Sequence, residues 1–462
     1  MRFARGRRNI VGMVVAVLAP LHAIVAQRAP ARDTARAVLP SDTITLQDAI
    51  AIALSQNNVT RFARNNVLLD SLSVRSARNA FLPNLNASST SSQGFGAKST
   101  VPGSDGNPFS FSAGVSSNVT IYNGRQNVNT LRQAQLNVRA SGEEFGRARQ
   151  TVVFTVANDY LNLITQQEQL RVQNENLVAQ EEELTQIQAF VDHGTRPIGD
   201  LYQEQAAVAQ TRLAVINARR ATENAKVDLV QELVLDPRRN YVFVTPATTA
   251  TTATPSQEPT FNLDSLFDVA LVQRADLRAE NLRVQAAQRD VDIARGTRLP
   301  VVTGSGGYST GYNSGNNGSF FSQLDQRRGG SIGAGVSVPI FDRGASLIAT
   351  QRALIALDNE LLTLRALGES VQLDVKRAFL DYNAAQEALV AADAQSAAAA
   401  LALEAAQARY RVGAATFVEV TLARATLIQA QSAVVNARSS VAFQRALMSY
   451  FTGGLDPARI TI

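Results

Sequence analysis

Two stretches of the chain alternate apolar and small polar residues over an unusual length. Within 107–122, the odd positions from Phe109 onward are apolar except for Ser117, and the even positions 110–120 hold serine, glycine, asparagine or threonine. The stretch 330–341 repeats this pattern. At about 3.3 Å per residue the first stretch predicts a strand of roughly 50 Å, whereas strands in soluble sheets span about 17–20 Å. Such a strand is long enough to cross a bilayer, although alternation alone also fits a soluble sandwich.

Helical patterns rich in glutamine, glutamate, arginine, alanine and leucine fill most of the remaining chain. A helix over 125–192 extends about 100 Å, and the turn at 193–197 makes the helix that follows it antiparallel. Thr45 is a plausible N-cap for the first helix. The predicted helices are 46–80, 125–192, 198–235, 263–298, 345–411 and 416–452, and the predicted strands are 83–95, 107–122, 300–312 and 330–341.

The same order of elements occurs twice, which indicates an internal duplication. The Leu-Pro pair that ends the first helix recurs at an offset of 217 (299 minus 82), and the glycine of the long-helix turn recurs at 219 (413 minus 194). A nearly constant offset over so much chain is typical of a repeat. The repeats are predicted at 46–239 and 263–452, with a flexible lead at 27–45, a linker at 240–262 and a tail at 453–462.

Composition narrows the classes of function. The chain has no cysteine and two histidines, which argues against a disulfide framework, a thiolate metal site or a Ser/His/Asp triad. We therefore expect neither an enzyme nor a cofactor. Residues 1–26 have the build of a secretory signal peptide, and they carry four arginines, so the net charge falls from +5 to +1 (5 minus 4) without them. A nearly neutral mature chain gives no support for nucleic-acid binding.

Strands are the predicted means of crossing the membrane, because beyond the signal peptide we expect no helix apolar enough to span one. Four strands per chain cannot close a barrel, and open sheet edges are not tolerated in lipid, so several copies must share one barrel. Two copies would give eight strands with a filled interior, and three would give twelve with a lumen; the serines and glycines favour the hollow form. The residues predicted to face lipid are Phe109, Phe111, Val115, Val119, Ile121, Ile332, Val336, Val338 and Ile340.

The chain resembles the TolC-like outer-membrane efflux proteins, also called outer-membrane factors or channel-tunnels. The resemblance rests on TLQDAIAIALSQN from Thr45, ADLRAENLRVQAAQRDVDIARGTRLPVV from Ala275, VPIFDRG from Val338 and RYRVGAATFVEV from Arg409. It implies a fold that is mainly α with membrane β, in which a homotrimer forms a twelve-stranded outer-membrane β-barrel and a periplasmic α-helical tunnel. It also implies a passive duct that works with a periplasmic adaptor and an inner-membrane pump of the RND, ABC or MFS type.

The resemblance places a candidate gate at the two turns between long helices. Family members carry acidic and aromatic residues there, and the matching positions are Asp200, Tyr410 and Glu419. We expect Tyr410 to hydrogen-bond Asp200, and three copies of Glu419 to form an acidic, cation-favouring ring. Where some members have an arginine, this chain has Ala415, and Arg196 occupies the equivalent place in the first half. The tip turns and adaptor contact are predicted at Gly194, Thr195, Gly413 and Ala414.

Simpler interpretations and other functions remain open at this stage. Asp200 and Glu419 also fit carboxylates that are merely solvated at exposed turns, and we interpret Glu181–Glu183 as a solvated helix face. The leading function is a duct for small molecules in a tripartite efflux system. The alternative is the outer-membrane channel of a type I protein secretion system, and a soluble periplasmic coiled-coil adaptor ranks below both.

Overall fold

The computed structural model describes residues 43–95, 109–244, 262–316 and 318–455. The predicted signal peptide and most of the predicted lead, linker and tail therefore lie outside the described residues. The first half contains β1 (Thr43–Ile44), α1 (Leu46–Gln56), α2 (Asn58–Asn79), β2 (Asn86–Gln93), β3 (Phe109–Asn123), α3 (Gln126–Asp192), α4 (Ile198–Glu232) and β4 (Val242–Phe243). The second half contains α5 (Leu263–Gln273), α6 (Ala275–Gly296), β5 (Val301–Asn313), α7 (Phe320–Gln326), β6 (Gly329–Ser337), α8 (Ala345–Arg411) and α9 (Phe417–Phe451).

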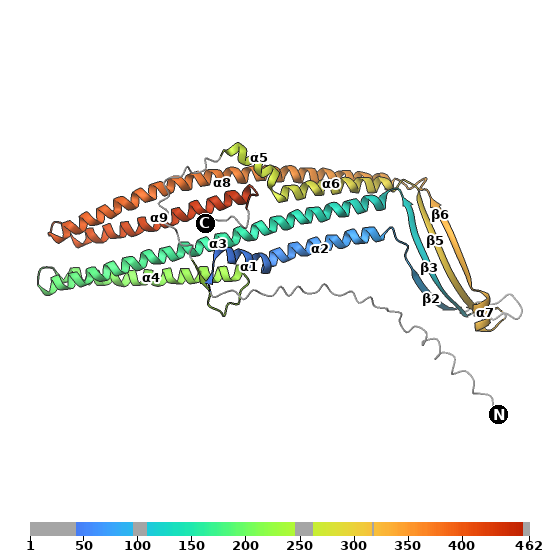
Figure 1. Cartoon of the computed structure of the whole chain (residues 1–462), viewed down its shortest axis with the longest axis horizontal. Helices are drawn as coiled ribbons and strands as arrows, with labels where there is room; N and C mark the ends of the chain where they lie inside the picture. Colours follow the sequence, from blue (N-terminus) through green and yellow to red (C-terminus); the bar gives the residue numbers. More distant parts are fainter. Residues whose placement is uncertain (1–42, 96–108, 245–261, 317, 456–462) are drawn as a thin grey trace, which may run out of the picture. The chain divides into compact units, whose positions relative to one another are not determined.

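The internal duplication is confirmed by the lengths of corresponding helices. The long helices α3 and α8 both have 67 residues, and the helices that return from them, α4 and α9, both have 35. Figure 1 shows each pair as an antiparallel hairpin, and the two hairpins lie beside each other. The fold is therefore mainly helical, with one repeated helix–strand–strand–helix–helix unit.

Two helices that were expected to be continuous are broken, and these predictions are corrected. The helix predicted over 46–80 is interrupted at Asn57, whose backbone is extended (φ −60°, ψ 135°) and whose side chain accepts a hydrogen bond from the Val59 N–H. The helix predicted over 263–298 is interrupted at Arg274, with φ −64° and ψ 123°. At Arg274 apolar residues continue at helical spacing, from Leu271 to Ala275, so periodicity alone could not reveal that break.

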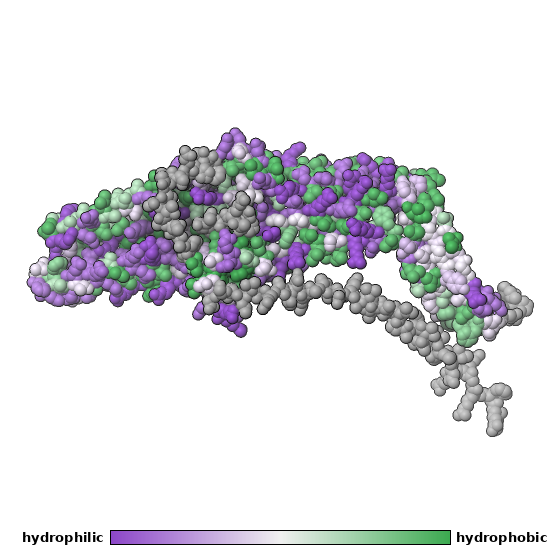
Figure 2. Space-filling view, viewed as in Figure 1, coloured by the Kyte–Doolittle hydropathy of each residue, from purple (hydrophilic) through white to green (hydrophobic). Residues whose placement is uncertain are grey.

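The four longer strands form one antiparallel sheet in the order β2-β3-β5-β6. Directly opposed residues share a face, so Val115 lies beside Tyr308, and Val119 lies beside Gly304. The apolar positions of β3 thus continue into β5 and then into Ile332 and Val336 of β6. The opposite face holds serine, threonine, asparagine and glycine. Figure 2 shows few strongly hydrophilic residues over the sheet, whereas the helices carry many.

The structure corrects the end of one predicted strand and adds two details to the sheet. The strand predicted over 330–341 ends at Ser337, so Val338 and Ile340 lie beyond it; Pro339 has no N–H to donate to a ladder. In β3 the register shifts between Thr120 and Tyr122, which places Ile121 in a bulge and brings Tyr122 opposite Val302 on the apolar face. The Ile121 side chain stays on this face, because a Cβ atom on Gly304 would lie 3.5 Å from its Cδ1 atom. The segment between β5 and β6 contains α7, whose Gln323 is buried and donates to the Asn313 carbonyl oxygen.

The helices continue the order of the strands. α2 leads into β2, β3 into α3, α6 into β5, and β6 into α8; contacts join α2 to α3, α3 to α6, and α6 to α8 (Figure 1). α2 and α8 are therefore the outer members of this layer. Both expose large apolar side chains: Phe62, Leu69 and Leu72 on α2, and Ile355, Leu362 and Leu373 on α8.

The parallel pair β1–β4 lies against the main core cluster, although its residues were expected in a flexible lead and a linker. Ile44 is fully buried, and Phe243 packs edge-on against the ring of Tyr160. The Tyr160 hydroxyl donates to the Val244 carbonyl oxygen at 2.5 Å. These contacts hold β1 and β4 against the middle of α3.

Among the residues that the structure describes, one helix, α8, is long and apolar enough to cross a membrane by length and composition, contrary to the expectation that no such helix follows the signal peptide. Alanine accounts for this property, since 384–408 contains fourteen of them. A single helix of this kind is weak support for a membrane span, and α8 packs along its length against α9 and α6.

Candidate functional site

The turns that join α3 to α4 and α8 to α9 have the same backbone design. Gly194 and Gly413 adopt left-handed conformations, with φ of 69° and 76°. In each turn the next N–H returns to a carbonyl oxygen of the preceding helix: Thr195 to Phe190 at 2.9 Å, and Ala414 to Arg409 at 2.8 Å. This arrangement satisfies carbonyl groups at the helix end, and glycine is the residue that enters it without steric cost.

Tyr410 and Asp200 join the two hairpins. The Tyr410 hydroxyl donates to Asp200 Oδ2 at 2.9 Å, from α8 to α4. Tyr410 is buried, and it belongs to an apolar cluster with Ile187, Leu201, Phe417 and Val420. Burial, followed by the hydrogen bond to Asp200, raises the pKa of Tyr410 to about 12, so the hydroxyl remains a donor at neutral pH.

Arg196 reaches across the same junction. Its guanidinium lies 4.0 Å from the centre of the Tyr410 ring and donates to the Tyr410 carbonyl oxygen. The second turn has Ala415 and supplies no cation here. The cation at the junction is Arg196, which comes from the first turn. A guanidinium over an aromatic face is attractive in itself and also shields the ring from water.

Glu419 is held by the start of its own helix. Its N–H donates to Thr416 Oγ1, and its carboxylate accepts from the Thr416 N–H at 3.2 Å, which together form a capping box. The carboxylate also lies 3.4 Å from Arg409 Nη1, and both side chains are about half exposed. The acidic ring remains a prediction; in the single chain Glu419 caps α9, a role that the spacing of Thr416 and Glu419 signals in the sequence.

A buried group of charges lies deeper in the same junction and was missed by sequence reasoning. Arg424 of α9 pairs with Glu183 of α3, and its Nη1 atom lies 3.8 Å from Glu204 Oε1 of α4. The Glu204 side chain is 2% exposed and that of Arg424 is 8% exposed. The solvated-face interpretation is therefore wrong for Glu183, whose side chain is only 14% exposed.

One arginine in this group serves two carboxylates, so one negative charge is in excess. Burial and, to a lesser extent, the charge of Glu183 raise the pKa of Glu204, while Arg424 lowers it, and the resulting pKa is about 7. A sequence signal existed: Glu204 occupies the buried stripe of α4 together with Leu201, Val208, Thr211 and Val215. A charged residue at such a position must find a partner on a neighbouring helix.

No group of three or more His, Asp or Glu side chains within the described ranges could hold a metal ion. The arrangement at the turns instead joins two hairpins through non-covalent contacts, which can break without a chemical reaction. A buried hydrogen bond, a stacked guanidinium and a shared arginine all cross from the α3–α4 hairpin to the α8–α9 hairpin. Sliding or rotating one hairpin against the other would break them together.

Comparison with known proteins identifies a family and a fold. The sequence matches the family described as "outer membrane efflux protein" over residues 50–233 and 266–453, one range for each half. It is 26% identical over 368 residues to the outer membrane protein TolC of Vibrio cholerae, which covers 79% of this chain and 80% of that protein. It is 25% identical over 429 residues to the outer membrane efflux protein BepC of Brucella suis, which covers 88% and 87%.

A solved structure has the same fold. The outer membrane protein VceC from Vibrio cholerae superimposes with a TM-score of 0.72 and 19% sequence identity. The alignment covers 88% of this chain and 96% of that chain.

Proposed function

This chain belongs to the outer membrane efflux protein family, and from that premise we propose that it is the outer-membrane duct of a tripartite efflux system. Three copies form the duct, which carries small molecules passively across the periplasm and the outer membrane. An inner-membrane pump and a periplasmic adaptor supply the energy and open the periplasmic end. The chain itself performs no chemical step and needs no cofactor.

The single observation that carries this proposal is that the outer strands of the sheet and the outer helices of the helical layer lie at the same two edges of the chain. β2 and β6 are the outer strands of the sheet, and α2 and α8 are the outer helices. Unpaired strand edges are not tolerated in lipid, and large apolar side chains on α2 and α8 need partners. Association of identical chains around one rotation axis would pair the strand edges and also cover the apolar side chains of α2 and α8.

The number of copies follows from the polar face of the sheet. Its serines, threonines and glycines suit a water-filled interior, because small polar side chains leave space and bind water. Eight strands would be filled by side chains, whereas twelve leave a lumen. Three copies are therefore proposed, with Phe109, Phe111, Val115, Val119, Ile121, Ile332 and Val336 turned to lipid.

The proposed gate is the junction between the two hairpins. Tyr410, Asp200 and Arg196 hold the α8–α9 hairpin against the α3–α4 hairpin near the turns. Their separation would widen the periplasmic end of the tunnel. Thr195, Ala414 and the turn glycines are proposed to contact the adaptor, since the space around both glycines is open in the chain.

Export of proteins in a type I secretion system uses the same kind of channel and is the second candidate. A deletion strain distinguishes the two functions, because loss of an efflux duct lowers resistance to toxic small molecules, whereas loss of a secretion channel removes proteins from the culture medium. The name of BepC, an outer membrane efflux protein, favours the first.

The test of the duct is the conductance of the purified, detergent-extracted protein in a planar bilayer. We expect a trimer that inserts and gives a small, cation-selective conductance. Glu419→Ala should reduce the selectivity if three copies of Glu419 line the opening. A protein that remains soluble and monomeric, with no channel, would overturn the proposal in favour of a periplasmic adaptor.

A further inference from the structure

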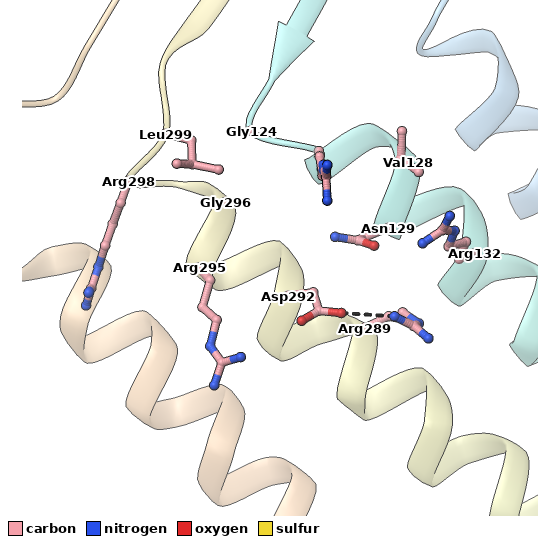
Figure 3. Close-up of a pocket in the computed structure, with 11 residues that line it drawn as sticks. Gly124, Val128, Asn129, Arg132, Arg289, Asp292, Arg295, Gly296, Arg298 and Leu299 are labelled. Atoms are coloured by element: carbon pink, nitrogen blue, oxygen red, sulfur yellow. Dashed lines mark hydrogen bonds and ion pairs between the residues drawn. The ribbon is translucent and has the colours of Figure 1, made fainter.

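A pocket rich in arginine lies where the sheet passes into the helices. It is a cavity of about 700 Å³ lined by the segment that joins β3 to α3 and by the end of α6 leading into β5. Figure 3 shows the close approach of the two chain segments at Gly124 and Gly296. A Cβ atom on Gly124 would lie 2.3 Å from the Gly296 carbonyl oxygen, so the two glycines allow this approach.

Five arginines line this pocket, and one carboxylate accompanies them. Arg125 and Arg132 come from the α3 side, while Arg289, Arg295 and Arg298 come from α6 and the turn after it. The carboxylate, Asp292, pairs with Arg289 at 3.1 Å (Figure 3). Four positive charges therefore remain without a lining carboxylate to offset them.

The remaining arginines are not neutralised by other parts of the described chain. Arg298 donates to the Ser346 hydroxyl at 3.3 Å, which is an uncharged partner. Among the ion pairs of the described residues, none involves Arg125, Arg132 or Arg295. Like charges that a fold holds together favour the binding of an anion.

The excess of positive charge extends sideways along the same end of the helices. A second hollow between α2 and α3, of about 590 Å³, is lined by Arg75, Arg78 and Arg139 and has no acidic lining residue. Arg132 and Arg139 are seven residues apart, so they lie along one face of α3, and Arg125 immediately precedes the first turn of that helix. The basic surface is thus a belt beside the sheet.

We propose that the arginine pocket binds the headgroup of a phospholipid with net negative charge, in the leaflet nearest the helices. The proposal rests on the membrane insertion of the sheet described above. Arginine suits a phosphodiester because its planar guanidinium donates two parallel hydrogen bonds to phosphate oxygens. A free phosphate offers the same chemistry, but the location favours a lipid.

The pocket lies beside the end of the sheet that joins the helices. β3 ends at Asn123 and β5 begins at Val301, immediately beside the pocket. Tyr122 and Val302 oppose each other on the apolar face. An acyl chain that lies against this face places its phosphate at the level of Arg125. Because α3 and α6 are inner helices of the layer, a neighbouring copy that packs on α2 or α8 does not fill the pocket.

The test is native mass spectrometry of the detergent-purified trimer with three probes: a short-chain phosphatidylglycerol, a phosphatidylcholine with the same chains, and inorganic phosphate. We expect the wild type to retain phosphatidylglycerol in preference to phosphatidylcholine. Arg125→Gln with Arg132→Gln should lower that retention about tenfold, because the variant loses two charged donors of hydrogen bonds to the lipid phosphate. Gln keeps the Cβ atom, so the backbone is unchanged.

The matched control is Arg171→Gln with Arg212→Gln, which removes two exposed arginines farther along the long hairpin. This control should retain phosphatidylglycerol as the wild type does. Equal retention of both lipids, equal loss in both double variants, or binding of inorganic phosphate alone would each overturn the proposal. A wild type that conducts in a bilayer but retains no lipid contradicts only this inference, whereas a protein that forms no channel contradicts the proposed function as well.

Discussion

At the residue scale, the hairpin junction depends on charges that are buried between helices. Arg424 is shared by Glu183 and Glu204, which come from the two helices of the opposite hairpin. Removing an arginine from such a site leaves two carboxylates in an apolar environment, whereas removing one carboxylate relieves an excess charge. The two changes are therefore expected to have opposite effects on the junction.

The first prediction concerns pH and Glu204→Gln. The pKa of Glu204 is about 7 in the folded chain, against an ordinary value of 4.5. Because the folded state keeps the proton over this range and the unfolded state loses it, wild-type stability falls as pH rises from about 4.5 to 7. Gln mimics the protonated form, so the variant should be more stable than the wild type at pH 8, by on the order of 3 kcal/mol, and nearly equal at pH 5.

This difference is measured as the denaturant midpoint of both proteins across pH 5–8. Glu223→Gln is a suitable control, because Glu223 is an exposed residue of the same helix. A difference between Glu204→Gln and wild type that is independent of pH would contradict the assignment of the raised pKa to Glu204.

The second prediction concerns Tyr410→Phe. The change removes the hydrogen bond to Asp200 while it keeps the packing against Phe417. Loss of one such bond should weaken the junction by about 1–2 kcal/mol and increase the fraction of time that the channel is open. Single-channel recordings test this, with Tyr202→Phe on the exposed side of α4 as the control. Unchanged opening in Tyr410→Phe would mean that this contact does not hold the gate.

At the element scale, Gly413 contributes a backbone conformation and no side-chain contact to the turn between two long helices. Gly413 has φ of 76°, and a Cβ atom there would meet no other atom within 4 Å. Any cost of a larger residue in the single chain therefore comes from the backbone angle. Gly368, inside α8, also has open space around its Cβ position but a helical backbone.

The third prediction compares these two glycines. Gly413→Ala should destabilise the chain by about 1–2 kcal/mol, because alanine resists the left-handed conformation. Gly368→Ala should stabilise it by about 0.5–1 kcal/mol, because alanine favours the helix. Denaturant midpoints of the two variants should thus move in opposite directions. Movement in the same direction would show that the turn conformation is not what Gly413 provides.

At the scale of the whole molecule, the two faces of the sheet are proposed to meet different solvents. Val115 and Ser116 are adjacent in β3 and lie on opposite faces, Val115 opposite Tyr308 and Ser116 opposite Gly307. Both side chains are exposed in the single chain. In the assembled barrel, one should contact lipid and the other the water-filled interior.

The fourth prediction is that Val115→Arg and Ser116→Arg differ in their effects. A charge on the lipid face near the middle of the membrane costs about 2–4 kcal/mol, so Val115→Arg should lower the yield of heat-resistant trimer. Ser116→Arg should assemble normally and alter conductance. Gel analysis of unheated and heated samples measures the yield, and equal yields of the two variants would contradict the assignment of the faces.

The long elements could be predicted from the sequence because their signals are local. The helix expected over 345–411 has those bounds in the structure, and the one expected over 125–192 begins one residue later. Composition, helix-ending glycines and alternation each act within a few residues of the element that they define. The Tyr410–Asp200 hydrogen bond was expected only from family resemblance; its geometry is present, and its role in gating remains a prediction.

The sequence by itself therefore determined the duplicated order of elements, the lengths of the long helices and the alternating faces of the strands, since all of these arise from local propensity and periodicity. Only the tertiary structure decided which distant side chains meet. At the two breaks, Asn57 donates to Glu232 and Arg274 lies 3.7 Å from Asp374, both far along the chain. The Glu183–Arg424–Glu204 group likewise joins three helices. The arginine pocket joins the two repeats. Such contacts exist only after packing brings separate segments together, so no local pattern specifies them.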